Sequence, residues 1–275
     1  MTWVYAIPLW LFAIGVIGII TALSAAGLLY TRRVFPHRDE ITHNDVAASV
    51  VATLGTILAV VLSFMVVTVW QEYDGAAGTV QSEVDAICNA YHAASTLPQP
   101  AKGLVQSNLA KYVNTVINVE WPLMRQGGES AEAHYEAFTL LKLITGYKPS
   151  NSTQEAIQTD MIAQSHAIND ARRERLFDNR QSIPHILWWM LLFISAVTIS
   201  SAYVFRVRNG LVHLGLTSAL AAVIASILVL IAQFDLPFRG DIQIQPTAFD
   251  HALQAISDDP PSSKYSPNVP KSDRR

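Results

Sequence analysis

The sequence predicts an all-α membrane protein: four transmembrane helices in two hairpins, with a long helical extramembrane bundle inserted between spans two and three. The first observation is composition, because 51% of the 275 residues are hydrophobic and only 15% are charged. The mean hydropathy of +0.26 is above that of most soluble domains. The second is that four segments lack Asp, Glu, Lys and Arg over about twenty residues or more, the length that crosses a bilayer. The third is the placement of the tryptophans.

The four predicted spans are residues 7–30, 46–70, 183–205 and 211–234. With four crossings, the starts of the first and third spans and the end of the second fall on one side of the membrane. Trp and Tyr favour membrane interfaces, and five tryptophans lie at these ends: Trp3, Trp10, Trp70, Trp188 and Trp189. A cleaved secretory signal is the alternative for the first span. Nothing basic precedes its apolar run, however, and Arg32 and Arg33 follow it, which favours an uncleaved anchor.

Two short connections and one long insert separate the spans. Pro36 and the charges of residues 31–45 end the first helix, and Asn209-Gly210 supplies turn residues between the third and fourth spans. The insert, residues 71–182, has helical periodicity. Its first part continues the second span with apolar residues alternately four and three apart, the spacing of a coiled-coil seam. The seam consists of Tyr73, Ala77, Val80, Val84, Ile87, Tyr91 and Ala94.

Further helices are expected in the rest of the chain. Within the insert they cover residues 103–121, residues 131–144 and a long segment that begins at Ser152-Thr153-Gln154-Glu155, which has the spacing of a capping box. Residues 235–256 are predicted to form a junction followed by a short amphipathic helix. The tail, residues 257–275, is rich in Pro and Ser and is expected to be disordered.

Composition and motifs disfavour several classes of function. The net charge of −3 and the lack of a basic stripe argue against a nucleic-acid partner. The histidines lack the spacing of a zinc site, and the sequence has neither a Gly-rich phosphate loop nor a G-x-S-x-G elbow. We therefore expect no enzyme, no cofactor and no bound metal. No span has an ionisable residue near its centre, which argues against a proton-coupled transporter.

One face of the second span combines hydroxyl groups with apolar side chains. Its residues are Thr56, Val60, Ser63, Phe64 and Val67. Such a face can line a narrow, weakly polar pore, in which hydrophobic constrictions gate by dewetting. The alternative is that the hydroxyl groups bond to their own helix and that the other side chains belong to the core.

Small residues recur three or four positions apart in three of the spans, which lets helix backbones approach closely. These stripes contain Gly18, Ala22 and Ala26 in the first span, Ala48, Ala52, Gly55 and Ala59 in the second, and Gly215, Ser218, Ala222 and Ala225 in the fourth. The spacing is equally consistent with packing inside one chain and with packing between copies.

The segment after the fourth span has an unusual set of residues: Asp235, Pro237, Phe238, Arg239, Gly240 and Asp241. An acid at a helix C-terminus is unfavourable unless a positive group compensates it. As a structural turn, Pro237 ends the helix and Gly240 allows a sharp exit. Phe238 then lies at the interface, while Arg239 neutralises Asp235 or reaches a lipid phosphate. The alternative is an ion-binding or gating site in which a cation compensates Asp235.

Five segments in order resemble the bestrophin-like domain family of four-span membrane proteins: VVTVWQEYDGA, VQSEVDAICNAYHAASTLPQP, LAKYVNTVINVEWPLM, ARRERLFDNRQSIPHILWWMLL and DLPFRGDIQIQP. They cover roughly residues 44–255. The family is distantly similar to bestrophins, which are pentameric ion channels, so the resemblance implies a channel. It also implies an apolar neck in the second span, near Val60 and Phe64.

The same resemblance bears on calcium. In bestrophins, an Asn-Pro-Phe-Gly segment after the fourth span is followed by an acidic run that holds calcium. The matching piece here is Leu236–Asp241, followed by Ile242-Gln243-Ile244-Gln245. Because the acidic run is missing and calcium needs about six or more oxygen ligands, a calcium site is not expected.

Two hypotheses for function follow. In the first, the chain forms a homo-oligomeric channel for small inorganic ions, with the second span around the pore. In the second, it is a non-conducting scaffold or sensor whose helical bundle binds a partner. In both, we expect a multi-pass protein in the lipid bilayer of a bacterial inner (cell) membrane.

Overall fold

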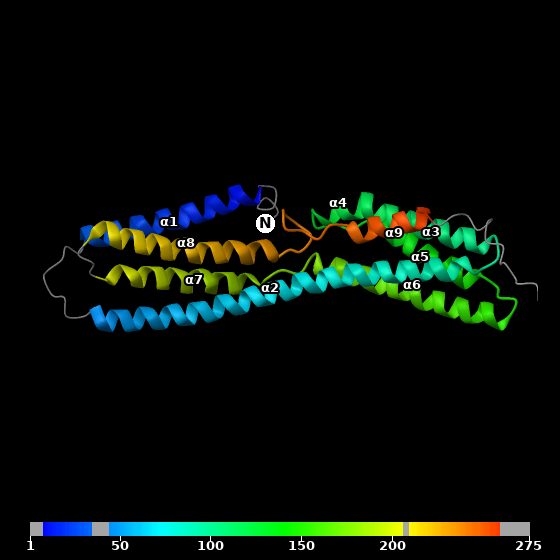
Figure 1. Ribbon diagram of the computed structural model, residues 1–275, viewed down its shortest axis with the longest axis horizontal. Coiled ribbons are helices and arrows are strands. Elements are labelled where there is room, and N and C mark those ends of the chain that lie inside the picture. Colours follow the sequence, from blue (N-terminus) through cyan, green and yellow to red (C-terminus); the bar gives the residue numbers. More distant parts are fainter. Residues whose placement is uncertain (1–7, 35–43, 206–208, 259–275) are drawn as a thin grey trace, which may run out of the picture. The chain divides into compact units, whose positions relative to one another are not determined.

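The computed structural model describes residues 8–34, 44–205 and 209–258, and all regular structure in these residues is helical (Figure 1). The elements are α1 (Leu9–Val34), α2 (Asn44–Ser95), α3 (Ala101–Thr115), the π-helical turn η2 (Val116–Glu120), α4 (Trp121–Met124), α5 (Ala131–Gly146), α6 (Ser152–Asp178), α7 (His185–Ser201), the 3₁₀ turn η3 (Ala202–Val204), α8 (Gly210–Phe234) and α9 (Thr247–Asp258). The predicted all-α fold is confirmed for this part of the chain. Most of the predicted disordered tail, from residue 259, and residues 35–43 and 206–208 of the two predicted turns lie outside the described residues.

Four of the described helices are long and apolar enough to cross a membrane: α1, α2, α7 with η3, and α8. Few residues of their most apolar stretches are buried within the chain, 11% in α1 and in α2, 28% in α7 and 39% in α8. Apolar surface exposed on this scale is unfavourable in water and favourable in hydrocarbon. The chain is therefore a membrane protein.

The chain divides into two compact units. The first contains the residues up to Thr79, Leu123–Gly128 and Arg173–Gln245, and the second contains Val80–Pro122, Glu129–Arg172 and the residues from Pro246. Both α2 and α6 begin in one unit and end in the other.

The first unit is built from α1, α7, α8 and the N-terminal part of α2. Helix α1 lies along α8 (Figure 1), and Gly27 of α1 lets Tyr203 of η3 approach so closely that an added Cβ would lie 3.0 Å from its ring. The buried core joins α2, α7 and α8 with Ile183, which lies two residues before α7. Its residues are Leu58, Leu62, Val69, Ile183, Leu191, Ile199, Ala221, Ile224, Leu228 and Ile231. These side chains fix the helices that position the junction after α8.

A hydrogen-bonded histidine ties three helices at the opposite end of this unit. The guanidinium of Arg32, at the end of α1, donates from Nη2 to Nδ1 of His213 in α8 at 2.8 Å. Because an arginine can only donate, Nδ1 is the acceptor, and Nε2 donates to the carbonyl oxygen of Ala202 at 3.0 Å. The buried His213 is thus structural. Asn209, predicted as a turn residue, caps α8 by accepting the N–H groups of Leu211 and Val212.

The second unit buries the later part of the predicted seam. Val80, Val84, Ile87, Tyr91 and Ala94 of α2 are all buried. Helix α3 packs against α5 and α9. Phe249 of α9 meets the ring of Trp121 edge-on, with 5.7 Å between ring centroids, which fixes the apolar face of the amphipathic helix.

A buried ion pair lies in the same unit. Glu120 accepts from Nη2 of Arg172 at 2.6 Å and from Nε at 3.2 Å, and it also accepts the N–H of Ser130. Both charged side chains are almost fully buried. Tyr112 donates its hydroxyl to the buried Glu83 at 2.5 Å. Such charges are tolerated in a core only when their partners are all in place.

The start of α6 differs from the predicted capping box. The side chain of Asn151, rather than a hydroxyl, accepts the N–H of Gln154 at 2.9 Å. Ser152 is already the first helical residue. Asn151 therefore occupies the cap position, and Gln154 reaches back to accept the N–H of Ser150.

Candidate functional site

The five residues predicted to line a pore lie together on the outward face of α2. Thr56, Val60, Ser63, Phe64 and Val67 are all exposed in the single chain, and Phe64 is 70% exposed. The opposite face holds Leu58, Leu62 and Val69, which are buried against α7 and α8. The predicted face is therefore not core, and it is available to lipid or to another copy.

The hydroxyl of Thr56 bonds to its own helix. Its Oγ1 donates to the carbonyl oxygen of Ala52 at 2.9 Å, and Thr53 and Thr68 donate in the same way to Ser49 and Phe64. This is the hydroxyl arrangement that the alternative interpretation of the face expects. The hydroxyl oxygen of Thr56 keeps lone pairs that can face an ion or water.

The stripes of small residues divide into two kinds. In α8 the stripe ends at Ala225, which is buried inside the chain. In α1, by contrast, Gly18, Ala22 and Ala26 are all exposed. In α2, Ala48, Ala52 and Ala59 are exposed as well. The α8 stripe therefore reaches the interior at its Ala225 end, whereas Gly215 is exposed, and the stripes of α1 and α2 are open to the close approach of a second helix backbone.

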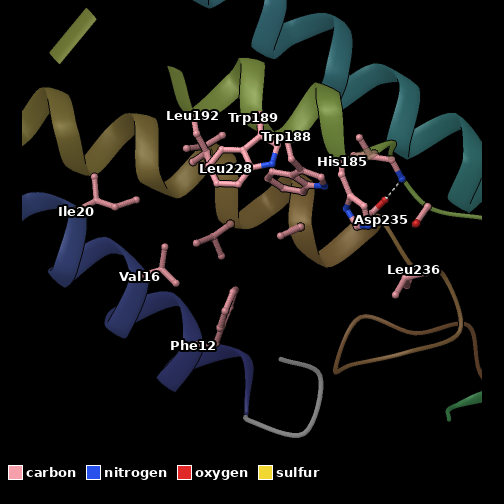
Figure 2. Close-up of a pocket in the computed structure, with 14 residues that line it drawn as sticks. Phe12, Val16, Ile20, His185, Trp188, Trp189, Leu192, Leu228, Asp235 and Leu236 are labelled. Atoms are coloured by element: carbon pink, nitrogen blue, oxygen red, sulfur yellow. Dashed lines mark hydrogen bonds between the residues drawn. The ribbon is translucent and has the colours of Figure 1, made fainter. Parts of the chain in front are cut away.

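Asp235, the first residue after α8, interacts with the N-terminus of α7. Its Oδ1 accepts the N–H of Ile183 at 2.6 Å, shown as a dashed line in Figure 2. The Trp188 side chain donates to the same carboxyl group, and His185 interacts with it electrostatically. Because a helix N-terminus carries partial positive charge, α7 supplies the compensation that the sequence requires for this acid.

Asp241, the second acid of the junction, has an equivalent role at another helix. Its Oδ2 accepts the N–H of Leu9, the first residue of α1, at 2.6 Å. The two acids thus connect the end of α8 to the beginnings of two other helices in the same unit.

The backbone between these acids forms a closed turn. The carbonyl oxygen of Pro237 accepts the N–H of Ile244 at 2.8 Å. Gly240 has φ +80°, in the left-handed region that favours glycine, as its predicted role in a sharp exit requires. Phe238, expected at the membrane interface, is instead fully buried.

Arg239 packs inside the protein. Its Nη2 donates to the carbonyl oxygen of Asn179 at 3.1 Å. A Cβ on Gly127 would lie 2.7 Å from the same nitrogen, so the guanidinium rests against the loop after α4. Gly127 itself has φ +83°. The structure therefore joins Arg239 to this loop and to Asn179, and it joins Asp235 to α7.

Two cavities meet the carboxyl group of Asp235. The larger, about 630 Å³, lies among α1, α7 and α8 and is lined mainly by apolar side chains (Figure 2). The smaller, about 170 Å³, contains three further acids, Glu72, Glu174 and Asp178, together with Thr79. The hydroxyl of Thr79 donates to Asp178 at 3.5 Å.

Burial and mutual repulsion affect the acids that lie outside the spans. Burial raises the pKa of Asp235 above its ordinary value, and the bonds from Ile183 and Trp188 oppose that rise. Burial, and then the charge of Glu174, raise the pKa of Asp178. In the part of the chain that the structure describes, no three His, Cys, Asp or Glu side chains converge on a point where a metal ion could bind.

The contacts around Asp235 were missed by sequence reasoning. Glu72, Asp178 and Ile183 come from three different segments, and their meeting depends on tertiary packing. A signal did exist for Ile183, because consecutive helices joined by a short turn run antiparallel. The end of α8 must then lie beside the start of α7, where an acid is favoured.

Comparison with known proteins gives a family and a fold. The sequence profile of the Bestrophin-like domain matches residues 18–249. No curated protein matches. Among solved structures, a bacterial bestrophin homologue from Klebsiella pneumoniae that carries a point substitution has a TM-score of 0.65 and 10% identity, over 90% of this chain and 99% of that one. A second substituted form of that homologue has a TM-score of 0.64 and 11% identity, over 90% and 97% of the two chains. A crystal structure described as a membrane protein, also a substituted form, has a TM-score of 0.64 and 12% identity, over the same shares.

Proposed function

This chain belongs to the bestrophin-like domain family, and from that premise we propose that it assembles into a homo-oligomeric ion channel with α2 around the pore. Bestrophin homologues are ion channels, and the fold similarity covers most of both chains. The proposal places four spans in two hairpins in the bilayer of a bacterial inner membrane, with the helices of residues 71–182 outside it.

The exposed face of α2 is the observation that carries the proposal. Thr56 and Ser63 bring hydroxyl oxygens to a face that is otherwise apolar. In an oligomer with this face at the axis, the rings of Phe64 and the side chains of Val60 form the narrowest, apolar part of the pore. Such a constriction conducts when it is wet and closes when it dries.

The outward stripes of small residues support close packing between copies. The stripe on α1 contains only Gly and Ala, and its counterpart on α2 lies beside the proposed pore face. Side chains of this size let two helices approach until their backbones are in contact. An assembly built on these stripes needs no polar group at the interface between spans.

The polar continuation of the α2 face favours cations. Val60, Val67 and Asp74 follow one another at seven-residue spacing, so they lie on nearly the same side of the helix, and Asp74 is exposed. Around a symmetry axis, Asp74 becomes a ring of carboxylates at one mouth of the pore. Rings of acids attract cations and repel anions.

Ion flux from liposomes that contain the purified protein tests the proposal. Phe64→Ala should increase potassium flux several-fold because it widens the apolar constriction, and chloride flux should remain lower than potassium flux. The matched control is Phe193→Ala, which removes an equally exposed ring from α7. Equal flux through the native protein and Phe64→Ala would remove α2 from the pore.

A non-conducting scaffold or sensor is the second candidate function. The back-bonded hydroxyl of Thr56 favours it, and so does the second unit, which has its own core and ion pair and could bind a partner without any pore. The mass of the protein in detergent separates the two candidates. A monomer is incompatible with the channel, and an oligomer without ion flux supports the scaffold.

A further inference from the structure

The larger cavity has the dimensions of a ligand site. Its volume of about 630 Å³ lies within the range of about 300 to 1,000 Å³ that small-molecule pockets occupy. Phe12, Val16 and Ile20 of α1 form one wall, and Trp188 and Leu192 of α7 with Leu228 of α8 form the wall that faces it (Figure 2). The space lies between helices that are proposed to cross the membrane, so an apolar molecule can reach it from the lipid.

One end of this apolar space is acidic. Asp235 and His185 lie together at that end, next to the ring of Trp188 (Figure 2). The hydrogen bonds to Asp235 come from the backbone N–H of Ile183 and from Trp188, which are neutral donors. The ion pairs of Glu120 with Arg172 and of Glu132 and Glu136 with Lys111 do not include Asp235.

A cation with an apolar body matches both features. We propose that this cavity binds a lipophilic ammonium ion, with its ammonium group beside Asp235 and its hydrocarbon tail between α1 and α8. An ammonium at this position can also lie against the indole of Trp188, since aromatic faces attract cations. Apolar walls strengthen the attraction because they lower the local dielectric.

The same geometry excludes the simpler occupants. Calcium needs about six oxygen ligands, and this cavity offers a single carboxyl group. A neutral amphiphile or a lipid chain would fill the apolar walls but would add no full positive charge to the partial compensation that Asp235 receives from the start of α7 and from His185. An organic ammonium fills the apolar walls and places a positive charge beside Asp235. Its binding is independent of whether the chain conducts ions.

Binding of three amphiphiles with one tail length tests the inference. The probes are decylammonium, decanol and decyl sulfate, each brominated on a chain carbon close to its head group and added to the full-length protein in a maltoside detergent. Bromine quenches tryptophan fluorescence on contact, so a probe next to Trp188 gives a saturable signal. The ammonium should bind about tenfold more tightly than the alcohol, and the sulfate more weakly than either.

Two variants connect the signal to the cavity. Asp235→Asn keeps an acceptor for Ile183 but removes the charge, so it should abolish the preference for the ammonium. Asp241→Asn makes the same change at an exposed acid of the same junction, keeps an acceptor for the N–H of Leu9, and should leave the preference for the ammonium unchanged. Ala232→Phe places a ring in the cavity and should reduce binding of all three probes.

Several results would overturn the inference. Equal affinity for the ammonium and the alcohol would make the cavity a simple hydrocarbon site. An unchanged ammonium preference in Asp235→Asn would separate the cation from this acid, and non-saturating quenching would exclude a site. If Asp235→Asn does not fold, the pH dependence of ammonium binding to the native protein tests the same point. Its ammonium affinity must fall on acidification through the raised pKa of Asp235, whereas pH-independent affinity contradicts the proposal.

Discussion

The two parts of α2 expose opposite kinds of surface. Between Ala48 and Trp70, three residues are buried and the apolar side chains of Val60, Phe64 and Val67 are exposed. From Val80 onward, apolar residues of the heptad seam are buried, and exposed positions such as Gln81 and Asp85 are polar. One continuous helix therefore has two surroundings. Its apolar side chains are exposed in the single chain where lipid or another copy can cover them, and they are buried where the surrounding is water.

The buried charges follow the same division. The second unit contains a complete ion pair in its core, Glu120 with Arg172. In the first unit, the carboxyl group of Asp235 interacts with the start of a helix and two cavities. A fully satisfied charge suits a stable core, and an acid next to open space suits a binding site. The difference is consistent with the proposal that the first unit contains the binding site.

Breaking the buried ion pair of the second unit should cause the largest loss of stability. Arg172→Met leaves the carboxylate of Glu120 buried without its cation, which should lower the free energy of unfolding by about 3–5 kcal/mol. Guanidinium unfolding in detergent, followed by circular dichroism, measures it. Removing both charges with Glu120→Gln and Arg172→Met should restore much of the loss. A single variant as stable as the native protein would show that the pair is not part of a core.

A matched pair of isoleucines tests the difference in packing between the two parts of α2. Ile87, in the second unit, is fully buried, and Ile57, in the first, is 49% exposed. Ile87→Ala should lower the free energy of unfolding by about 2–4 kcal/mol through a cavity, and Ile57→Ala should change it by less than about 1 kcal/mol. The same unfolding experiment measures both. Equal losses would mean that the membrane part of α2 is packed like the rest.

Replacing Asp235 in the first unit should have a smaller, pH-dependent effect on stability. Burial raises the pKa of Asp235, so its contribution to stability is complete below the pKa of the unfolded chain and is lost as pH rises through the folded value. Asp235→Asn removes that loss, and its melting temperature should exceed that of the native protein at neutral pH and approach it in acid. Asp241→Asn is the control. If the native protein instead gains stability relative to Asp235→Asn as pH rises, the prediction is contradicted.

The sequence predicted those features that depend on the spacing of apolar residues or on a single residue. The charge-free segments predicted the apolar helices, the alternating spacing predicted the buried seam from Val80 to Ala94, and Gly240 has the positive φ expected of a sharp exit. Each depends only on neighbours along the chain. The outward face of α2 was also identifiable, although its role as a pore stays a prediction.

Features that depend on packing could not be predicted. Arg239 was expected to neutralise Asp235 or to reach a lipid phosphate, but the antiparallel packing of α7 and α8 places Ile183 and Trp188 beside Asp235. Phe238 is buried because the junction folds back through the bond from Ile244 to Pro237. The large cavity arises from the way α1, α7 and α8 pack against one another, and no local pattern encodes it.

Water access to the exposed face of α2 decides whether this helix surrounds a pore. Phe64→Cys and Phe193→Cys, each combined with Cys88→Ala, place single thiols at two exposed ring positions of the first unit. The protein in liposomes is treated with a membrane-impermeant cationic thiol reagent. We predict rapid modification of Phe64→Cys with a change in ion flux, and little modification of Phe193→Cys. Equal protection of both thiols would place α2 in lipid and contradict the account.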